Sequence, residues 1–136
     1  MVSKEQCMKM ILEHFPKFQE KWQEHLDWWE GESAGLCNDM SAFSKYVLEL
    51  LQNKSDDNEV KDIFIFIEKL MVEGTQEVQD ATATCFLENL VNATSWNRIS
   101  AESFVHLLGE ESKEYCRAWD EFTEVKTDGL WIDEDI

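Results

Sequence analysis

Ser33 lies in residues 31–35, "GESAG", which match the GxSxG pattern of the nucleophile elbow in α/β-hydrolases. In that elbow a strand precedes the serine and a helix follows it, which exposes the hydroxyl at the top of a parallel sheet. Here the preceding residues have helical spacing, and no sheet pattern flanks the segment. We therefore expect a flexible loop in which Gly31 ends a helix, and we predict no catalytic residue.

The three histidines do not form a recognisable metal motif. His14, His25 and His106 are not preceded three residues earlier by Glu, and no HExxH pattern occurs. Glu102 and His106 share a helix face at i, i+4, which is typical of a surface pair. The acidic runs at 56–59 and 133–136 lack the spacing of a calcium loop, and glycine-rich phosphate loops are missing. We expect neither a metal nor a cofactor.

The charge of the chain favours a basic partner. Twenty-nine acidic residues against twelve basic ones give a formal net charge of -17. This charge disfavours direct binding to nucleic acid or to an anionic membrane, and it attracts cationic proteins. The alternative interpretation is that the acidity serves only solubility. Because neither a signal-peptide pattern nor a long apolar run occurs, we expect a cytoplasmic protein without a membrane span.

The four cysteines, at positions 7, 37, 85 and 116, are widely separated and form no CxxC pair. In a reducing cytosol such residues behave as small apolar side chains rather than as disulfide partners. We therefore expect all four to be buried, unpaired thiols.

The first helical region contains both tryptophans of the segment "EHLDWWEGE" at 24–32. Ser3 and Gln6 form a capping box at its start, and Pro16 predicts a kink or a junction of two helices. With Trp22 as centre, the apolar stripe stays within roughly 40°, whereas Trp28 lies about 120° away. We therefore predict that Trp29 belongs to the core and that Trp28 is exposed. The stripe consists of Met8, Ile11, Phe15, Phe18, Trp22, Leu26 and Trp29.

Two further helices are predicted before residue 75. Asp39 can cap the first helix, and the apolar pattern of this helix ends in the polar loop at 52–59. The second contains "IFIFI" at 63–67, which alone resembles a strand, but the surrounding apolar residues keep helical spacing and Gly74 supplies a stop.

The rest of the chain completes an all-α pattern. Thr75 opens an apolar helix that we expect to be central, residues 100–109 form a short capped helix, and Tyr115 and Trp119 mark a last one. We predict a single compact bundle of about six to seven short amphipathic helices. It forms one domain over 1–126, followed by an acidic C-terminal tail over 127–136.

Acidic residues and exposed aromatic residues together form the candidate binding surface. Glu13 and several later acids lie opposite the apolar stripe, which a simple solvated helix face would also explain. Large aromatic residues supply binding energy while carboxylates steer a basic partner. The residues that we predict to bind the partner are Glu20, Glu24, Asp27, Trp28, Glu30, Asp56, Asp57, Glu59, Trp131, Asp133 and Glu134.

Three blocks, "FPKFQEKWQEHLDWW", "GLCNDMSAFSKYV" and "TCFLENLVN", resemble a family of small acidic bacterial proteins known only as a domain of unknown function. Some members of that family are similar to immunity proteins of toxin systems. The resemblance covers roughly residues 15–95. It implies a bacterial, intracellular and helical protein, and it implies immunity by association.

The leading hypothesis is an immunity-type protein that neutralises a cationic toxin domain, with a nuclease as the foremost case. The acidic surface would cover the basic cleft of the toxin. One alternative is an acidic adaptor or nucleic-acid mimic that binds another basic protein. Another is a small hydrolase that uses Ser33 or a carboxylate pair.

Overall fold

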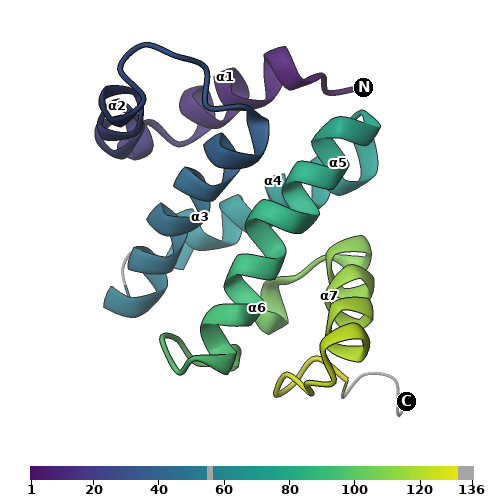
Figure 1. Ribbon diagram of the computed structural model, residues 1–136. Coiled ribbons are helices and arrows are strands. Elements are labelled where there is room, and N and C mark those ends of the chain that lie inside the picture. The colour runs from purple at the N-terminus through teal and green to yellow at the C-terminus, as the bar shows by residue number, and fades with distance from the viewer. Residues whose placement is uncertain (55–56, 132–136) are drawn as a thin grey trace.

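The computed structural model describes residues 1–54 and 57–131, and within these ranges the chain folds into seven α-helices (Figure 1). The predicted all-α class is confirmed. The described residues contain one β feature, an isolated parallel bridge between Val2 and Gly74. The helices are α1 (Lys4–His14), α2 (Gln19–Trp28), α3 (Leu36–Asn53), α4 (Asp57–Glu73), α5 (Gln76–Thr82), α6 (Glu88–Ser95) and α7 (Glu110–Thr123).

The start of the chain follows the sequence signals. The backbone N–H of Ser3 donates to Oε1 of Gln6 (3.0 Å), which forms the predicted capping box of α1. Pro16 begins a 3-10 turn, Pro16–Phe18, between α1 and α2. Its fixed φ and missing N–H suit the first position of a helical turn. The predicted junction of two helices at Pro16 is confirmed.

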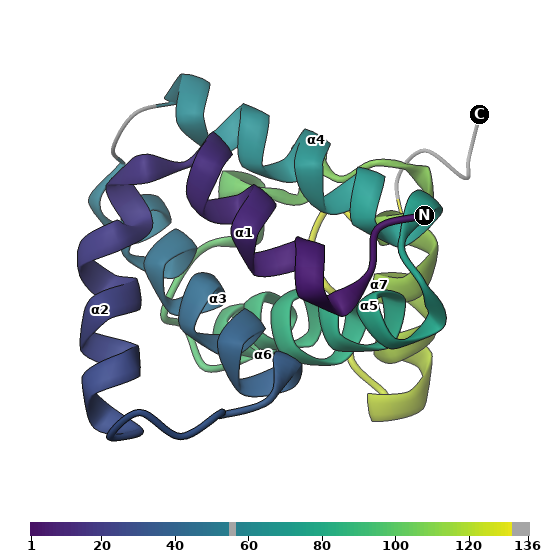
Figure 2. The ribbon, with the colours of Figure 1, turned by 90° about the horizontal axis from the view of Figure 1, so that it is seen from above.

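The predicted core position of Trp29 is wrong. Trp28 is 82% exposed, as expected, but Trp29 is only half-buried and Leu26 is 38% exposed. Phe18 is buried and Trp22 packs against the core, so the apolar stripe keeps its phase past the 3-10 turn but reaches the core only as far as Trp22. In addition, α2 ends at Trp28, and it lies at the edge of the bundle with every residue at least partly exposed (Figure 2).

Aromatic side chains form the centre of the core. Phe43 of α3 is fully buried, and its ring centroid lies 5.1 Å from that of Phe18 and 5.7 Å from that of Phe86. Phe86 also contacts Phe64 of α4, which stacks on Phe104. These rings join the first, middle and last thirds of the chain into one core, where large apolar side chains contribute most to stability.

The helix predicted from "IFIFI" is confirmed as α4, in which Ile63, Phe64 and Ile67 are buried. Gly74 follows the helix directly, and a Cβ at this position would lie 2.5 Å from the carbonyl oxygen of Leu70. Glycine is therefore the residue that fits this helix end.

The helix predicted from Thr75 is also present, with an irregular middle. The hydroxyl of Thr75 accepts a hydrogen bond from the N–H of Val78 (3.4 Å) at the start of α5. A π-helical segment, Ala83–Leu87, then joins α5 to α6. This segment packs against both α3 and α7, so the predicted central position is confirmed.

Two predicted helix details are wrong. Gly35, not Asp39, is the N-cap of α3, and Asp39 lies in the first turn with its side chain bonded elsewhere. Residues 100–109 contain two 3-10 turns, Ala101–Ser103 and Val105–Leu107, rather than one α-helix. The backbone of Phe104, with φ of -141°, leaves the helical region between the two turns.

The first residues of the predicted tail pack against α7. Thr127 and Leu130 are buried, and the buried carboxylate of Asp120 accepts hydrogen bonds from the N–H and the hydroxyl of Thr127, both 2.8 Å long. The predicted boundary at residue 126 therefore falls inside packed structure. Asp133 and Glu134 lie outside the described residues.

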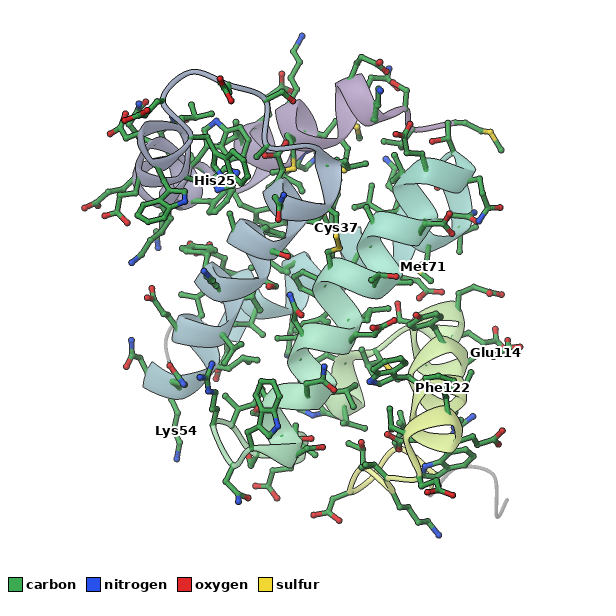
Figure 3. All side chains as sticks on the ribbon, in the orientation of Figure 1. His25, Cys37, Lys54, Met71, Glu114 and Phe122 are labelled. Carbon is green, nitrogen blue, oxygen red and sulfur yellow. A yellow bond between two sulfur atoms is a disulfide. The ribbon has the colours of Figure 1, made fainter. Side chains whose placement is uncertain are left out.

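Two of the four cysteines are not the free thiols that we expected. Cys37 and Cys85 form a disulfide, with their Cα atoms 5.4 Å apart (Figure 3). They are 48 residues apart in sequence, and only the packing of α3 on the π-helical segment brings them together. Cys7 and Cys116 are free and buried, as predicted.

Cys116 gives the protein an expected weakness at alkaline pH. Burial, with the charges of Asp120 and Glu88, raises the pKa of its thiol from 9.0 to about 12. The unfolded chain releases this proton at lower pH than the folded protein, so the free energy of unfolding should fall as the pH rises from 9 to 12. Urea unfolding across this range checks the prediction. Cys116→Ala should flatten the dependence, and an unchanged slope would contradict this assignment.

Candidate interaction surface

An exposed tryptophan stands at the C-terminal end of α2, among carboxylates. A shallow hollow there is lined by Asp27, Trp28, Trp29, Glu30 and Glu32. Glu24, one turn earlier on α2, lies on the other side of Trp28. We call the set Glu24, Asp27, Trp28, Glu30 and Glu32 the Trp28 surface.

The backbone after α2 turns sharply and fixes the acidic residues of the loop. Glu30 and Gly31 have φ of 49° and 84°, in the left-handed region that ends many helices. The N–H of Glu30 donates to the carbonyl of Asp27 (3.1 Å), and the N–H of Glu32 donates to the carbonyl of Trp29 (2.9 Å). These turns hold the start of the loop, and Glu30 and Glu32 line the same hollow as Trp28.

A histidine–aspartate pair attaches this end of α2 to α3. The Nε2–H of His25 donates to Oδ1 of Asp39 (2.8 Å), and the two side chains are only 12% and 21% exposed. The His25 ring lies between two indoles, with its centroid 5.3 Å from Trp22 and 6.5 Å from Trp29. Figure 3 shows His25 on α2 beside α3. Trp29 thus supports the turn that presents Trp28.

A groove of about 520 Å³ runs between α2 and α3 on the other side of Trp28. Lys21 and Glu49 face each other across it, with Nζ and Oε1 3.2 Å apart. The hydrogen bond to Glu49, together with the charges of Glu49 and Glu24, raises the pKa of Lys21. Nζ of Lys21 also lies 4.0 Å from Oε2 of Glu24, so this base offsets part of the charge of one carboxylate of the Trp28 surface, while Asp27, Glu30 and Glu32 keep the end of α2 acidic.

The other predicted binding residues do not converge on Trp28. Glu20 is exposed earlier on α2, and Asp57 is exposed at the start of α4. Figure 2 shows the start of α4 near the beginning of α2, at the end of that helix away from Trp28. Asp56 lies outside the described residues.

Two of the predicted binding residues have partners on other elements of the fold, whereas Glu24 and Asp27 contact Lys21 and Gln23 of their own helix. Glu59 accepts a hydrogen bond from the Tyr46 hydroxyl, and its Oε1 lies 3.8 Å from Nζ of Lys17. Trp131 is half-buried, and its Nε1–H donates to Oδ2 of Asp120 (3.1 Å). Tertiary contacts therefore hold both side chains, and the binding role of Glu59 and Trp131 stays a prediction.

The structure adds three residues that sequence reasoning missed. Glu32 was not selected because it falls in a loop without periodicity, although it is part of "EHLDWWEGE". The pair of His25 and Asp39 joins residues 14 positions apart on different helices, which no local pattern indicates.

The segment with the hydrolase-like motif is a loop between α2 and α3, as expected, with Ser33 exposed in it. In the described residues no strand precedes this loop. No group of three metal-ligating side chains occurs among the same residues. No helix that the structure describes has the length and apolar character needed to cross a bilayer.

The fold and this surface define a small acidic helical protein with an aromatic side chain presented among carboxylates. Residues 8–124 match the family described as Domain of unknown function (DUF7674), and the chain belongs to this family. The matched region includes the Trp28 surface and all seven α-helices apart from the first residues of α1. Neither the curated proteins nor the solved structures contain a match. The resemblance to a family of unknown function is thus confirmed in its general form.

Proposed function

We propose that this protein binds a basic protein through the Trp28 surface, and that the partner is a cationic toxin domain which it neutralises as an immunity-type protein. The observation that supports this proposal most strongly is the exposure of Trp28. An indole that is 82% exposed contributes almost nothing to folding, yet here it is surrounded by carboxylates on a chain with a net charge of -17.

The Trp28 surface combines the two kinds of residue that are typical of tight protein interfaces, an aromatic residue that supplies binding energy and charged residues that attract the partner. Tryptophan is enriched among residues that dominate binding energy, and its ring face attracts Lys and Arg side chains. The surrounding Asp27, Glu30 and Glu32 raise the rate at which a basic partner arrives. A nuclease has a basic cleft because it binds phosphate, so it fits both properties.

The surface is also held in place before binding. The hydrogen bond between His25 and Asp39 joins the two helices, and the turn at Glu30 and Gly31 fixes the loop. A preorganised surface loses less conformational entropy when it binds. This rigidity favours a binding role over a simple solvated helix face.

The test needs the partner as ligand, and a toxin reading frame directly upstream of the gene would identify it and support the immunity proposal. Its purified basic domain can then be titrated with this protein. We expect Glu24→Lys combined with Asp27→Lys to slow association about tenfold at low salt and to weaken its salt dependence.

The matched control changes the net charge equally at a distance from Trp28. Asp62→Lys combined with Glu121→Lys reverses two exposed acids on α4 and α7. Stopped-flow association of this control should stay within about twofold of the wild type. If both double variants slow association equally, net charge rather than the Trp28 surface captures the partner, and the proposed site is wrong.

A further inference from the structure

The two sulfur atoms of the disulfide lie in different environments. Cys37 is exposed, whereas Cys85 is 3% exposed within the π-helical segment. The backbone around Cys85 is also held, because its carbonyl accepts a hydrogen bond from Nδ2 of Asn89 (2.8 Å). Cys37 is therefore the exposed half of the disulfide, through which an incoming thiol reaches the bond.

We propose that Cys37 is a site of reversible thiol–disulfide exchange, at which a low-molecular-weight thiol such as glutathione forms a mixed disulfide. Cys85 is the internal resolving thiol of this exchange. The pair forms a redox-controlled link between the first turn of α3 and the π-helical segment at the centre of the fold.

Each step of the exchange balances. A glutathione thiolate attacks Sγ of Cys37, a new S–S bond forms, and the bond to Cys85 breaks. Cys85 leaves as a thiolate and takes a proton from water. A second glutathione thiolate then attacks the glutathione sulfur of the mixed disulfide, which releases Cys37 and one molecule of oxidised glutathione. Two electrons pass from the glutathione pair to the cysteine pair, and oxidised glutathione reverses the sequence.

The two free cysteines, Cys7 and Cys116, are internal controls for the reactivity of Cys37 toward thiols and disulfides. Burial raises the pKa of Cys7 to about 11 and that of Cys116 to about 12, in each case from 9.0. The thiolate is the form that exchanges, so both groups stay unreactive near neutral pH. Cys37 is exposed and is the second residue of an 18-residue helix, where the helix N-terminus favours an anion.

The disulfide between Cys37 and Cys85 also restrains the loop that precedes α3. Cys37 lies two residues before Asp39, whose carboxylate holds His25. With the disulfide broken, the first turn of α3 loses its covalent attachment to the central segment. We expect the preceding loop, residues 30–35, to be cut by proteases more readily in the reduced protein.

Peptide mapping by mass spectrometry tests the site. Cys85→Ser leaves the Cys37 thiol free, and with oxidised glutathione it should form the mixed disulfide at Cys37 at least about tenfold more than at Cys7 or Cys116. The matched variant Cys37→Ser keeps the buried Cys85 thiol and should stay unmodified while folded, as checked by circular dichroism.

The wild-type protein provides a measurement that does not depend on either variant folding. After brief treatment with reduced glutathione and rapid quenching with an alkylating agent in denaturant, which exposes the buried thiols, glutathione should be found on Cys37 and the alkyl group on Cys85, Cys7 and Cys116. Glutathione on Cys85, Cys7 or Cys116, or no glutathione on Cys37, would overturn the proposal.

Discussion

Phe43→Ala is expected to lower the free energy of unfolding by about 3–5 kcal/mol. Phe43 is fully buried on α3, and its ring contacts those of Phe15, Phe18 and Phe86. Truncation removes apolar surface from the core and leaves a cavity that these rings can fill only in part. Urea unfolding followed by circular dichroism, with the disulfide intact, measures the loss.

Phe122→Ala is the matched control for this prediction. Phe122 is 78% exposed on α7 (Figure 3). Its ring stacks on that of Trp119. We expect a change within about 0.5 kcal/mol, as for most surface substitutions. Equal losses in both variants would show that the ring cluster around Phe43 does not organise the core.

Local patterns were sufficient to predict the helices. In α4 the positions of Val60, Phe64 and Ile67 gave helical spacing, and this outweighed the strand-like appearance of "IFIFI". Pro16 and Thr75 marked junctions that the structure contains. These signals are reliable because each depends on residues within one or two turns.

Features that depend on tertiary contacts could not be predicted in this way. The bond between Cys37 and Cys85 spans 48 residues, and Asp120 binds Thr127 through a reversal of the chain after α7. Trp29 is only half-buried because α2 ends at Trp28 and lies at the edge of the bundle, which depends on how the helices pack. No periodicity within a single helix contains this information.

In the candidate site, too, the features that depend on neighbours in sequence were predictable and those that depend on tertiary contacts were not. The angle between adjacent side chains on a helix correctly predicted an exposed Trp28, and Asp27 and Glu30 lie beside it as neighbours in sequence. Glu59 and Trp131 were also selected for their composition, but each is held by residues from another part of the chain. The residue type identifies a candidate charged or aromatic side chain, but only the tertiary structure shows whether that side chain is exposed or held by partners within the protein.

Trp28→Ala is expected to weaken binding of the toxin domain by at least about 30-fold, which corresponds to about 2 kcal/mol. The reason is that truncation removes the aromatic anchor while the surrounding carboxylates remain. Since Trp28 is 82% exposed in the free protein, its loss should leave the melting temperature almost unchanged. Trp96→Ala is the matched control, because Trp96 is 66% exposed but lies at the end of α6.

Isothermal titration of the purified toxin domain with the wild type, Trp28→Ala and Trp96→Ala tests the proposed function most directly. We predict tight binding by the wild type and by Trp96→Ala, and at least about 30-fold weaker binding by Trp28→Ala, with equal melting temperatures for all three proteins. Equal affinities for the three proteins, or no binding by the wild type, would contradict the assignment of Trp28 and its carboxylates as the partner surface.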